Sequence, residues 1–207
     1  MAKRGCGLGV VSEPWRVPPN HPCWATDDTG SAAVMWRDTL HSPPCSMSER
    51  GKGYVVVRWG LVSVMSIYAP PRWSQAEFEG VLHDMHASAR RHLLMSPGGI
   101  IVAGDFNAKN PLWGSPAADQ RGHTLEGWAS GLGLVLINTG QASTFLCRRG
   151  RSIVDLTWAS PPAARRIGHW EVVIERETLS DHRHIEMVVN AASREVLARR
   201  RELEASR

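Results

Sequence analysis

The residues with the clearest chemical potential in this sequence are Asp105 and Asn107, which follow the apolar run Ile100–Ala103 in the segment GDFNA. Side chains two positions apart in a strand point to the same face of a sheet, so this carboxylate and amide lie together at a strand end. Such a pair can hold and polarise a water molecule or a phosphate. The structural alternative is an Asx-turn that closes the strand and uses the same residue types.

A second group of polar residues comes later in the chain. Ser180, Asp181 and His182 precede the apolar run Ile185–Val189. An aspartate there can ligate a metal, and a histidine can move a proton or donate to a phosphoryl oxygen. A cap with a surface histidine is the structural alternative. Asp155 is the one charge in the apolar segment SIVDLTW. A buried carboxylate is costly unless it is paired, so we expect Asp155 to pair with His182.

Two further polar residues end apolar runs nearer the amino terminus. Glu13 follows the first run in the segment VVSEP, and Tyr68 ends another in the segment SIYAPP. Each of these motifs is weak evidence for a function by itself. Their order along the chain is the more specific indication.

The elements that position these residues are predicted to be mainly strands. Apolar runs of strand length, rich in β-branched residues and bounded by Gly, Pro, Ser or Asp, recur along the chain. They cover Leu8–Val11, Ala32–Trp36, Tyr54–Arg58, Leu61–Tyr68, Ile100–Ala103, Val135–Ile137, Ile153–Trp158, Trp170–Ile174 and Ile185–Val189.

Helices are predicted between some of these strands. Ser74 and Glu77 have the spacing of a capping box, and apolar residues continue at helical spacing to Leu93. A second, shorter helix is expected from about His123 to Ser130. Helices inserted among strands, without strict alternation, favour a mixed α/β sandwich over a doubly wound parallel sheet.

The composition excludes two broad classes of protein. The 207 residues are 43% hydrophobic and 21% charged, which excludes intrinsic disorder, and no apolar run is long enough to cross a membrane. The formal net charge of +4 favours polyanionic partners, with a solvated basic surface as the alternative. The four cysteines have no zinc-site spacing, so we expect reduced thiols in an intracellular protein.

The ordered motifs resemble the endonuclease/exonuclease/phosphatase superfamily, which includes deoxyribonuclease I-like enzymes and abasic-site endonucleases. The segments SEPW, WATDDTGSAAVMW, GDFNAKNPLWGSPAADQRGHTLEGW, SIVDLTWAS and LSDHRHI are similar to the endonuclease domain of arthropod non-LTR retrotransposons. The resemblance implies a four-layer α/β sandwich of the deoxyribonuclease I type over residues 1–190. The charged composition of residues 191–207 predicts a helical tail or linker.

The resemblance also implies a role for each polar residue. Glu13 and Asp181 would be metal-site carboxylates for Mg²⁺, with Mn²⁺ as the alternative ion. Asp105 would orient or deprotonate the attacking water, and Asn107 and Tyr68 would hold the scissile phosphate. Asp155 would orient His182, which would stabilise the charge that develops on the phosphorus oxygens.

One feature of the family has no counterpart in this sequence. Family members begin with a further strand that ends in a metal-site asparagine, whereas only twelve residues precede Glu13 here. We therefore expect an amino-terminally incomplete domain that lacks its first strand. The reverse transcriptase domain expected in an intact element is also absent from this chain.

The resemblance implies a metal-dependent endonuclease acting on double-stranded DNA in the nucleus, with no membrane partner. It would nick a target strand by phosphodiester hydrolysis to prime retrotransposon reverse transcription. The main alternative is a catalytically impaired retroelement remnant with residual nucleic-acid binding. A phosphatase acting on small phosphate esters is a further alternative within the same superfamily.

Overall fold

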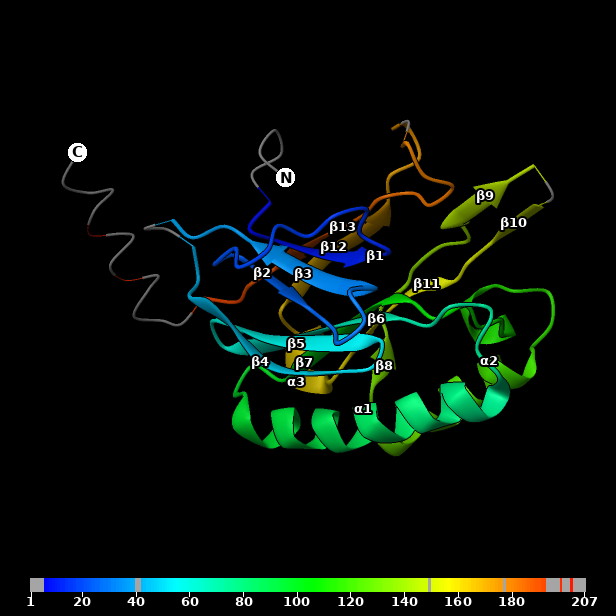
Figure 1. Ribbon diagram of the computed structural model, residues 1–207, viewed down its shortest axis with the longest axis horizontal. Helices are drawn as coiled ribbons and strands as arrows, with labels where there is room; N and C mark the ends of the chain where they lie inside the picture. Colours follow the sequence, from blue (N-terminus) through cyan, green and yellow to red (C-terminus); the bar gives the residue numbers. More distant parts are fainter. Residues whose placement is uncertain are drawn as a thin grey trace.

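The computed structural model describes residues 6–39, 42–148, 150–176 and 178–192, together with residues 198 and 202. A six-stranded sheet with the order β4-β5-β6-β7-β11-β8 lies at its centre (Figure 1). These strands are β4 (Cys45–Gly51), β5 (Tyr54–Trp59), β6 (Val62–Tyr68), β7 (Ile100–Asp105), β11 (Asp155–Ala159) and β8 (Val135–Leu136). The neighbours β6 and β7 are parallel, and the other pairs are antiparallel.

Smaller sheets pack on one face of this central sheet. One has the order β1-β3-β2, with β1 (Leu8–Ser12), β2 (Trp24–Thr26) and β3 (Ala32–Trp36). The other pairs β12 (Ile167–Val172) with β13 (Ile185–Val189). Apolar side chains fill the interface: Val34 contacts the valines of β5 and β6, and Val10 and Met187 pack against β7. Within the described residues, β1 pairs with β3 alone and β13 with β12 alone.

Helices cover the opposite face of the central sheet (Figure 1). Helix α1 (Gln75–Met95) begins with the predicted capping box between Ser74 and Glu77 and ends at Ser96. Its buried stripe, which includes Phe78 and Met85, packs on the central sheet in the largest apolar cluster. Burial of each such side chain contributes about 1.5–3 kcal/mol.

Helix α2 (Gln120–Gly131) lies against α1 and starts earlier than the sequence predicts. The Asp119 carboxylate caps it by accepting the Gly122 N–H, and a cap of this kind sets the helix start. The four-residue helix α3 (Pro161–Ala164) follows β11, and the 3₁₀ turn η2 (Pro111–Trp113) precedes α2. The predicted α/β sandwich is therefore confirmed, and the described residues form three of its four expected layers.

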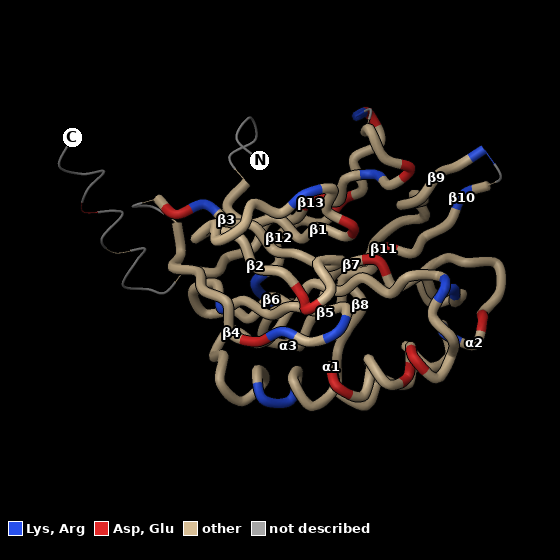
Figure 2. Tube along the Cα trace, in the orientation of Figure 1, with Lys and Arg blue, Asp and Glu red and all other residues tan. Residues whose placement is uncertain are grey.

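Four strands lie outside the apolar runs predicted as strands, because their sequences are polar or short. The edge strand β4 has mostly exposed side chains in the segment CSMSERG, and β2 has three residues. The ribbon of β9 (Phe145–Cys147) and β10 (Gly150–Ser152) projects from the body of the molecule (Figure 1). Figure 2 shows basic residues near its tip. The predicted hairpin through Gly60 is present as β5 and β6.

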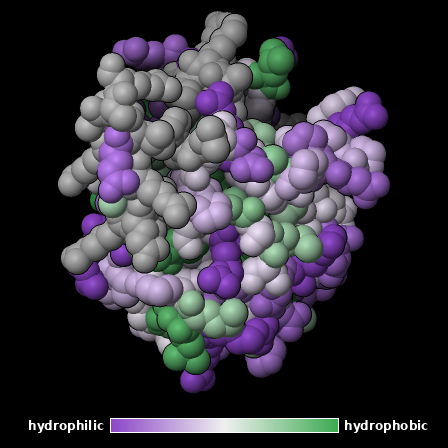
Figure 3. Space-filling model, turned by 90° about the vertical axis from the view of Figure 1, so that its left-hand side faces the viewer, coloured by the Kyte–Doolittle hydropathy of each residue, from purple (hydrophilic) through white to green (hydrophobic). Residues whose placement is uncertain are grey.

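The predictions for the two ends of the chain are not tested by the described residues. The expected tail over residues 191–207 lies largely outside the described residues, and the expected absence of a family strand before Leu8 stays a prediction. No helix among the described residues is long and apolar enough to span a membrane. Figure 3 views the end of the molecule where α1 terminates. It shows a small hydrophobic patch at the lower edge of this face. Leu94 and Met95 are exposed in the last turn of α1.

Candidate active site

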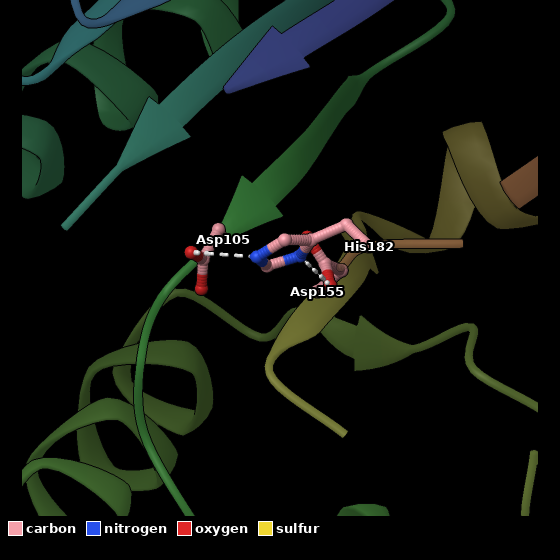
Figure 4. A group of neighbouring side chains, drawn as sticks. All are labelled: Asp105, Asp155 and His182. Carbon is pink, nitrogen blue, oxygen red and sulfur yellow. Dashed lines mark hydrogen bonds and ion pairs between the residues drawn. The ribbon is translucent and has the colours of Figure 1, made fainter. Parts of the chain in front are cut away.

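The strand register brings the two aspartates of the sequence motifs face to face. Asp105 ends β7, Asp155 begins β11, and the two residues are directly paired in the antiparallel ladder. His182 reaches the same place from the loop before β13 (Figure 4). One ligand atom from each of these three residues lies within 4.8 Å of the others. Residues widely separated in the sequence therefore form one cluster.

The predicted pair of Asp155 and His182 is present. His182 Nδ1 lies 2.8 Å from Asp155 Oδ2, while its Nε2 lies 4.0 Å from Asp105 Oδ2. The hydrogen bond with Asp155 raises the pKa of His182 against the opposing effect of burial. The longer separation exceeds a direct hydrogen bond and suits one intervening oxygen atom. The imidazole is thus held at Nδ1 and free to donate through Nε2.

Asp105 is the most deeply buried member of the cluster, with 2% of its surface exposed. Burial raises the pKa of Asp105 to about 7, and the nearby charge of Asp155 adds to this effect. Hydrogen bonding from Asn107 and the charge of His182 act in the opposite direction. A carboxyl group with a pKa near neutral can exchange a proton at physiological pH.

Asn107 shows that the segment GDFNA can form an Asx-turn and also present a carboxylate to the site. Its backbone N–H donates to Asp105 Oδ1 at 2.9 Å and its side-chain amide donates to Oδ2 at 2.8 Å. This is the Asx-turn of the structural alternative, and it orients the Asp105 carboxylate. Asn107 also has a φ of 45°, in the left-handed region that is rare outside glycine.

Glu13 and Tyr68 border this cluster. Tyr68 ends β6 and is paired with Asp105 in the parallel ladder. The pKa of Tyr68 is raised first by burial and then by a hydrogen bond to Glu13. The charge of Glu13 also raises the pKa of both Asp105 and His182, so its carboxylate faces the site. Glu13 is exposed and has a φ of 49° where the chain leaves β1.

Of the predicted site residues, both metal-site carboxylates lie outside the three-residue cluster: Glu13 borders it, and Asp181 contributes no side chain to it. Asp181 is exposed and lies outside the group formed by Asp105, Asp155 and His182, although it directly precedes His182. Its backbone carbonyl accepts the Leu146 N–H at 2.8 Å. Its metal-binding role stays a prediction.

Thr144 supports the cluster without carrying a charge. Its buried hydroxyl accepts the N–H groups of Val154 and Asp155, both at 3.1 Å. Its carbonyl accepts the Arg183 N–H at 2.7 Å. Thr144 therefore fixes the backbone beside Asp155 and the backbone beside His182. The sequence offers a weak signal for it, a threonine among ordinary loop residues.

Three more residues complete the support. Asn138 donates to the Asp155 carbonyl at 3.1 Å and accepts the Thr157 N–H at 2.7 Å. The Phe145 ring lies edge-on to the His182 imidazole, with 4.9 Å between the ring centres. Ser12, at the end of β1, accepts the Asp105 N–H at 3.3 Å and so links the two sheets at the site.

Arg121 holds the segment that follows Tyr68. Its Nη2 donates to the carbonyls of Pro70 at 3.1 Å and Trp73 at 2.6 Å. Its guanidinium lies 5.0 Å from the centre of the Phe78 ring. These contacts connect α2 to the turn between β6 and α1, and so stabilise the strand end that carries Tyr68.

Comparison with known proteins agrees with this arrangement. The family described as endonuclease-reverse transcriptase matches residues 62–186. The chain belongs to this family. The matched range contains Tyr68, Asp105, Asn107, Asp155 and His182, whereas Glu13 lies before it.

Curated relatives come from mobile elements of Drosophila melanogaster. The chain is 29% identical over 103 residues to the probable RNA-directed DNA polymerase from transposon X-element, covering 46% of this chain and 10% of that protein. It is also 29% identical over 103 residues to the RNA-directed DNA polymerase from mobile element jockey, covering 47% and 10%. The alignments thus span about a tenth of the length of these relatives.

Solved structures support the same fold. The endonuclease domain of TRAS1, a telomere-specific non-LTR retrotransposon, matches with a TM-score of 0.77 and 25% identity, covering 91% of this chain and 88% of that one. An AP endonuclease from Archaeoglobus fulgidus matches with a TM-score of 0.68 and 15% identity, covering 91% of both chains. The fold is therefore that of the deoxyribonuclease I-like α/β sandwich.

Proposed function

We propose that this chain is a divalent-metal-dependent endonuclease that nicks one strand of double-stranded DNA by phosphodiester hydrolysis. The observation that carries the proposal is the cluster of Asp105, Asp155 and His182, with His182 bonded to one aspartate and separated by 4.0 Å from the other. Two acidic groups and an oriented imidazole at the end of a sheet match the needs of phosphoryl chemistry.

The residues at the site fit a divalent cation. Glu13, Asp105 and Asp155 bring three carboxyl groups close together, and their mutual repulsion contributes to the raised pKa of Asp105. A bound cation would relieve this excess of negative charge, and oxygen ligands suit Mg²⁺ or Mn²⁺. Because Asp155 already accepts from His182 and Asp105 lies opposite His182 Nε2, Glu13 is the carboxylate left to hold the ion. When bound, the ion would neutralise charge on the phosphate.

The protein groups can then divide the remaining work. Asp105 orients the attacking water and accepts its proton. His182, oriented by its hydrogen bond with Asp155, donates through Nε2 to a non-bridging phosphate oxygen as negative charge grows there. Tyr68 and Asn107 hold the same phosphate.

The products follow from the bond that breaks. The water oxygen bonds to phosphorus, and the bond from phosphorus to the 3′ oxygen breaks, so that this oxygen departs with the electron pair and takes up a proton. One strand then carries a 3′-hydroxyl and its neighbour a 5′-phosphate. A 3′-hydroxyl is the end that a reverse transcriptase extends. We therefore propose that the chain makes the nick from which reverse transcription is primed. We expect this reaction to take place in the nucleus.

The test is conversion of supercoiled plasmid to the open-circular form with Mg²⁺, Mn²⁺ or EDTA. The parent chain should nick with either ion and not with EDTA, and the nick should be extended by a DNA polymerase, which requires a 3′-hydroxyl. Asp105→Ala and His182→Ala should each lower the nicking rate at least about a hundredfold, as expected for groups that act in the transition state.

A matched control is available on β12. His169 and Glu171 form another histidine–carboxylate pair, at 3.5 Å, with both side chains largely exposed and outside the cluster. His169→Ala should nick like the parent chain. Nicking that survives His182→Ala, or that proceeds unchanged in EDTA, would contradict the proposal. DNA binding without nicking by the parent chain would favour the impaired remnant instead.

A further inference from the structure

Two large apolar side chains stand fully in solvent beside the candidate active site. Trp15 is 100% exposed and Leu179 is 112% exposed relative to an extended reference. They are the two most exposed large hydrophobic residues in the described part of the chain. Trp15 follows Glu13 by two positions, and Leu179 precedes His182 by three.

Chain geometry limits how far these side chains can lie from the chemistry. Two residues span at most about 7 Å and three at most about 11 Å. Base pairs of a duplex rise 3.4 Å each. The backbone of Trp15 therefore lies within about two base-pair rises of Glu13, and that of Leu179 within about three of His182.

The fold gives no account of this exposure. Neither side chain belongs to the apolar clusters that the described residues form. Isolated exposed hydrophobic residues are common on protein surfaces, but here both extreme cases border one site. Each also has an exposed arginine nearby in the chain, Arg16 next to Trp15 and Arg176 three positions before Leu179.

The backbone of the segment that carries Trp15 is conformationally restricted. Glu13 turns the chain away from β1 with its positive φ, and Pro14 directly precedes the tryptophan. Pro18 and Pro19 restrict the segment further. An indole on a stiff segment loses little conformational freedom when it binds a flat partner.

Resting on the proposed nuclease function, we propose that Trp15 and Leu179 contact the bases that flank the scissile phosphate of duplex DNA. Apolar side chains that enter a groove press against or between base pairs and kink the duplex, while neighbouring arginines neutralise phosphates. Flexible pyrimidine–purine steps are kinked most easily. The two residues therefore influence where the duplex is nicked as well as how tightly it is held.

The experiment compares Trp15→Ala, Trp15→Phe and Leu179→Ala on two labelled duplexes. The first is a complete duplex with one mapped nicking site. The second has the same sequence but carries abasic analogues at the positions that flank the scissile phosphate. Leu94→Ala is the matched control, because Leu94 is 90% exposed near the carboxyl end of α1, next to the opposite end of β7 from Asp105.

On the complete duplex, Trp15→Ala should raise KM about tenfold with kcat nearly unchanged, as expected for loss of a base-stacking contact. Leu179→Ala should raise KM less, and Trp15→Phe should retain most of the parent affinity. On the abasic duplex the parent chain and both alanine variants should have the same KM, because the bases are gone. Nicking sites mapped on supercoiled plasmid should shift away from pyrimidine–purine steps in Trp15→Ala.

Three results would overturn the inference alone. These are parent-like KM for both alanine variants, an equal loss on both duplexes, or a loss in kcat without a change in KM. Each leaves the proposed function intact if His182→Ala is inactive while the parent chain nicks. If the parent chain does not nick, the proposed function fails. Fluorescence anisotropy of the two labelled duplexes then tests the inference by measuring binding alone. Equal binding of the complete duplex by the parent chain and Trp15→Ala would refute it.

Discussion

Replacement of Thr144 by valine tests whether the hydroxyl group of this residue holds the site together. Valine keeps the volume and the β-branched shape but removes the acceptor of the buried Val154 N–H group and of the partly buried Asp155 N–H group. A buried donor left without a partner costs about 1–3 kcal/mol. For two donors that share one acceptor we expect Thr144→Val to lower the free energy of unfolding by about 3 kcal/mol.

Thr144→Ser is the matched control, since serine keeps the acceptor and loses one methyl group. Its cost should be about 1 kcal/mol. Urea unfolding followed by tryptophan fluorescence separates the two variants. With a slope of about 3 kcal/mol per M, the urea midpoint should fall by about 1 M for valine and about 0.3 M for serine.

The same substitution should also affect nicking. Thr144 fixes the backbone on both sides of the pair of Asp155 and His182, and small displacements at such a site cost up to about a hundredfold in rate. We expect kcat for plasmid nicking to fall at least about tenfold in Thr144→Val and by less than threefold in Thr144→Ser. Equal midpoints and equal kcat for the two variants would refute the positioning role.

Four other perturbations have defined outcomes. Asp27 accepts several backbone N–H groups, which hold its pKa low despite burial; Asp27→Asn should lower the unfolding free energy by about 2–3 kcal/mol in urea. Burial lowers the pKa of His92, so the unfolded chain takes up the proton first and stability should fall as the pH drops below 6.5. Urea midpoints from pH 5 to pH 8 should show this loss in the parent chain and a flatter profile in His92→Gln. Arg121→Lys should lower kcat several-fold through Tyr68, because lysine cannot donate to both the Pro70 and Trp73 carbonyls in the same geometry; an unchanged kcat would contradict this. Replacing Arg148 and Arg151 of the β9–β10 ribbon by glutamine should reduce the slope of log K against log salt for DNA binding by up to about two, and an unchanged slope would exclude contact.

Much of the fold could be predicted from the sequence, because the core strands and α1 carry strong local patterns. The capping box of Ser74 and Glu77 and the apolar stripe of α1 predict the helix start within one residue. The continuous apolar strands β6 and β7 are fully recognisable for the same reason. Polar edge strands such as β4 were missed, since their stability comes from pairing with β5 and not from their own side chains.

The limits of prediction at the site have a different physical origin. Asp155 was recognisable because a charge in an apolar strand costs several kcal/mol unless a partner lies nearby, which makes such a residue rare without a purpose. Thr144 and Asn138 give no such signal, because hydroxyl and amide groups occur in any loop. They stabilise the site by hydrogen bonding to backbone N–H and carbonyl groups. Nearly every residue has these backbone groups, so the sequence does not show which of them need a partner. Charged catalytic groups can therefore be recognised in a sequence, because burying a charge has a high free-energy cost. Residues that position those groups can be recognised only from the folded backbone. The same reasoning applies to Trp15, which is one tryptophan among nine in the sequence and becomes distinctive only through its full exposure two residues from Glu13.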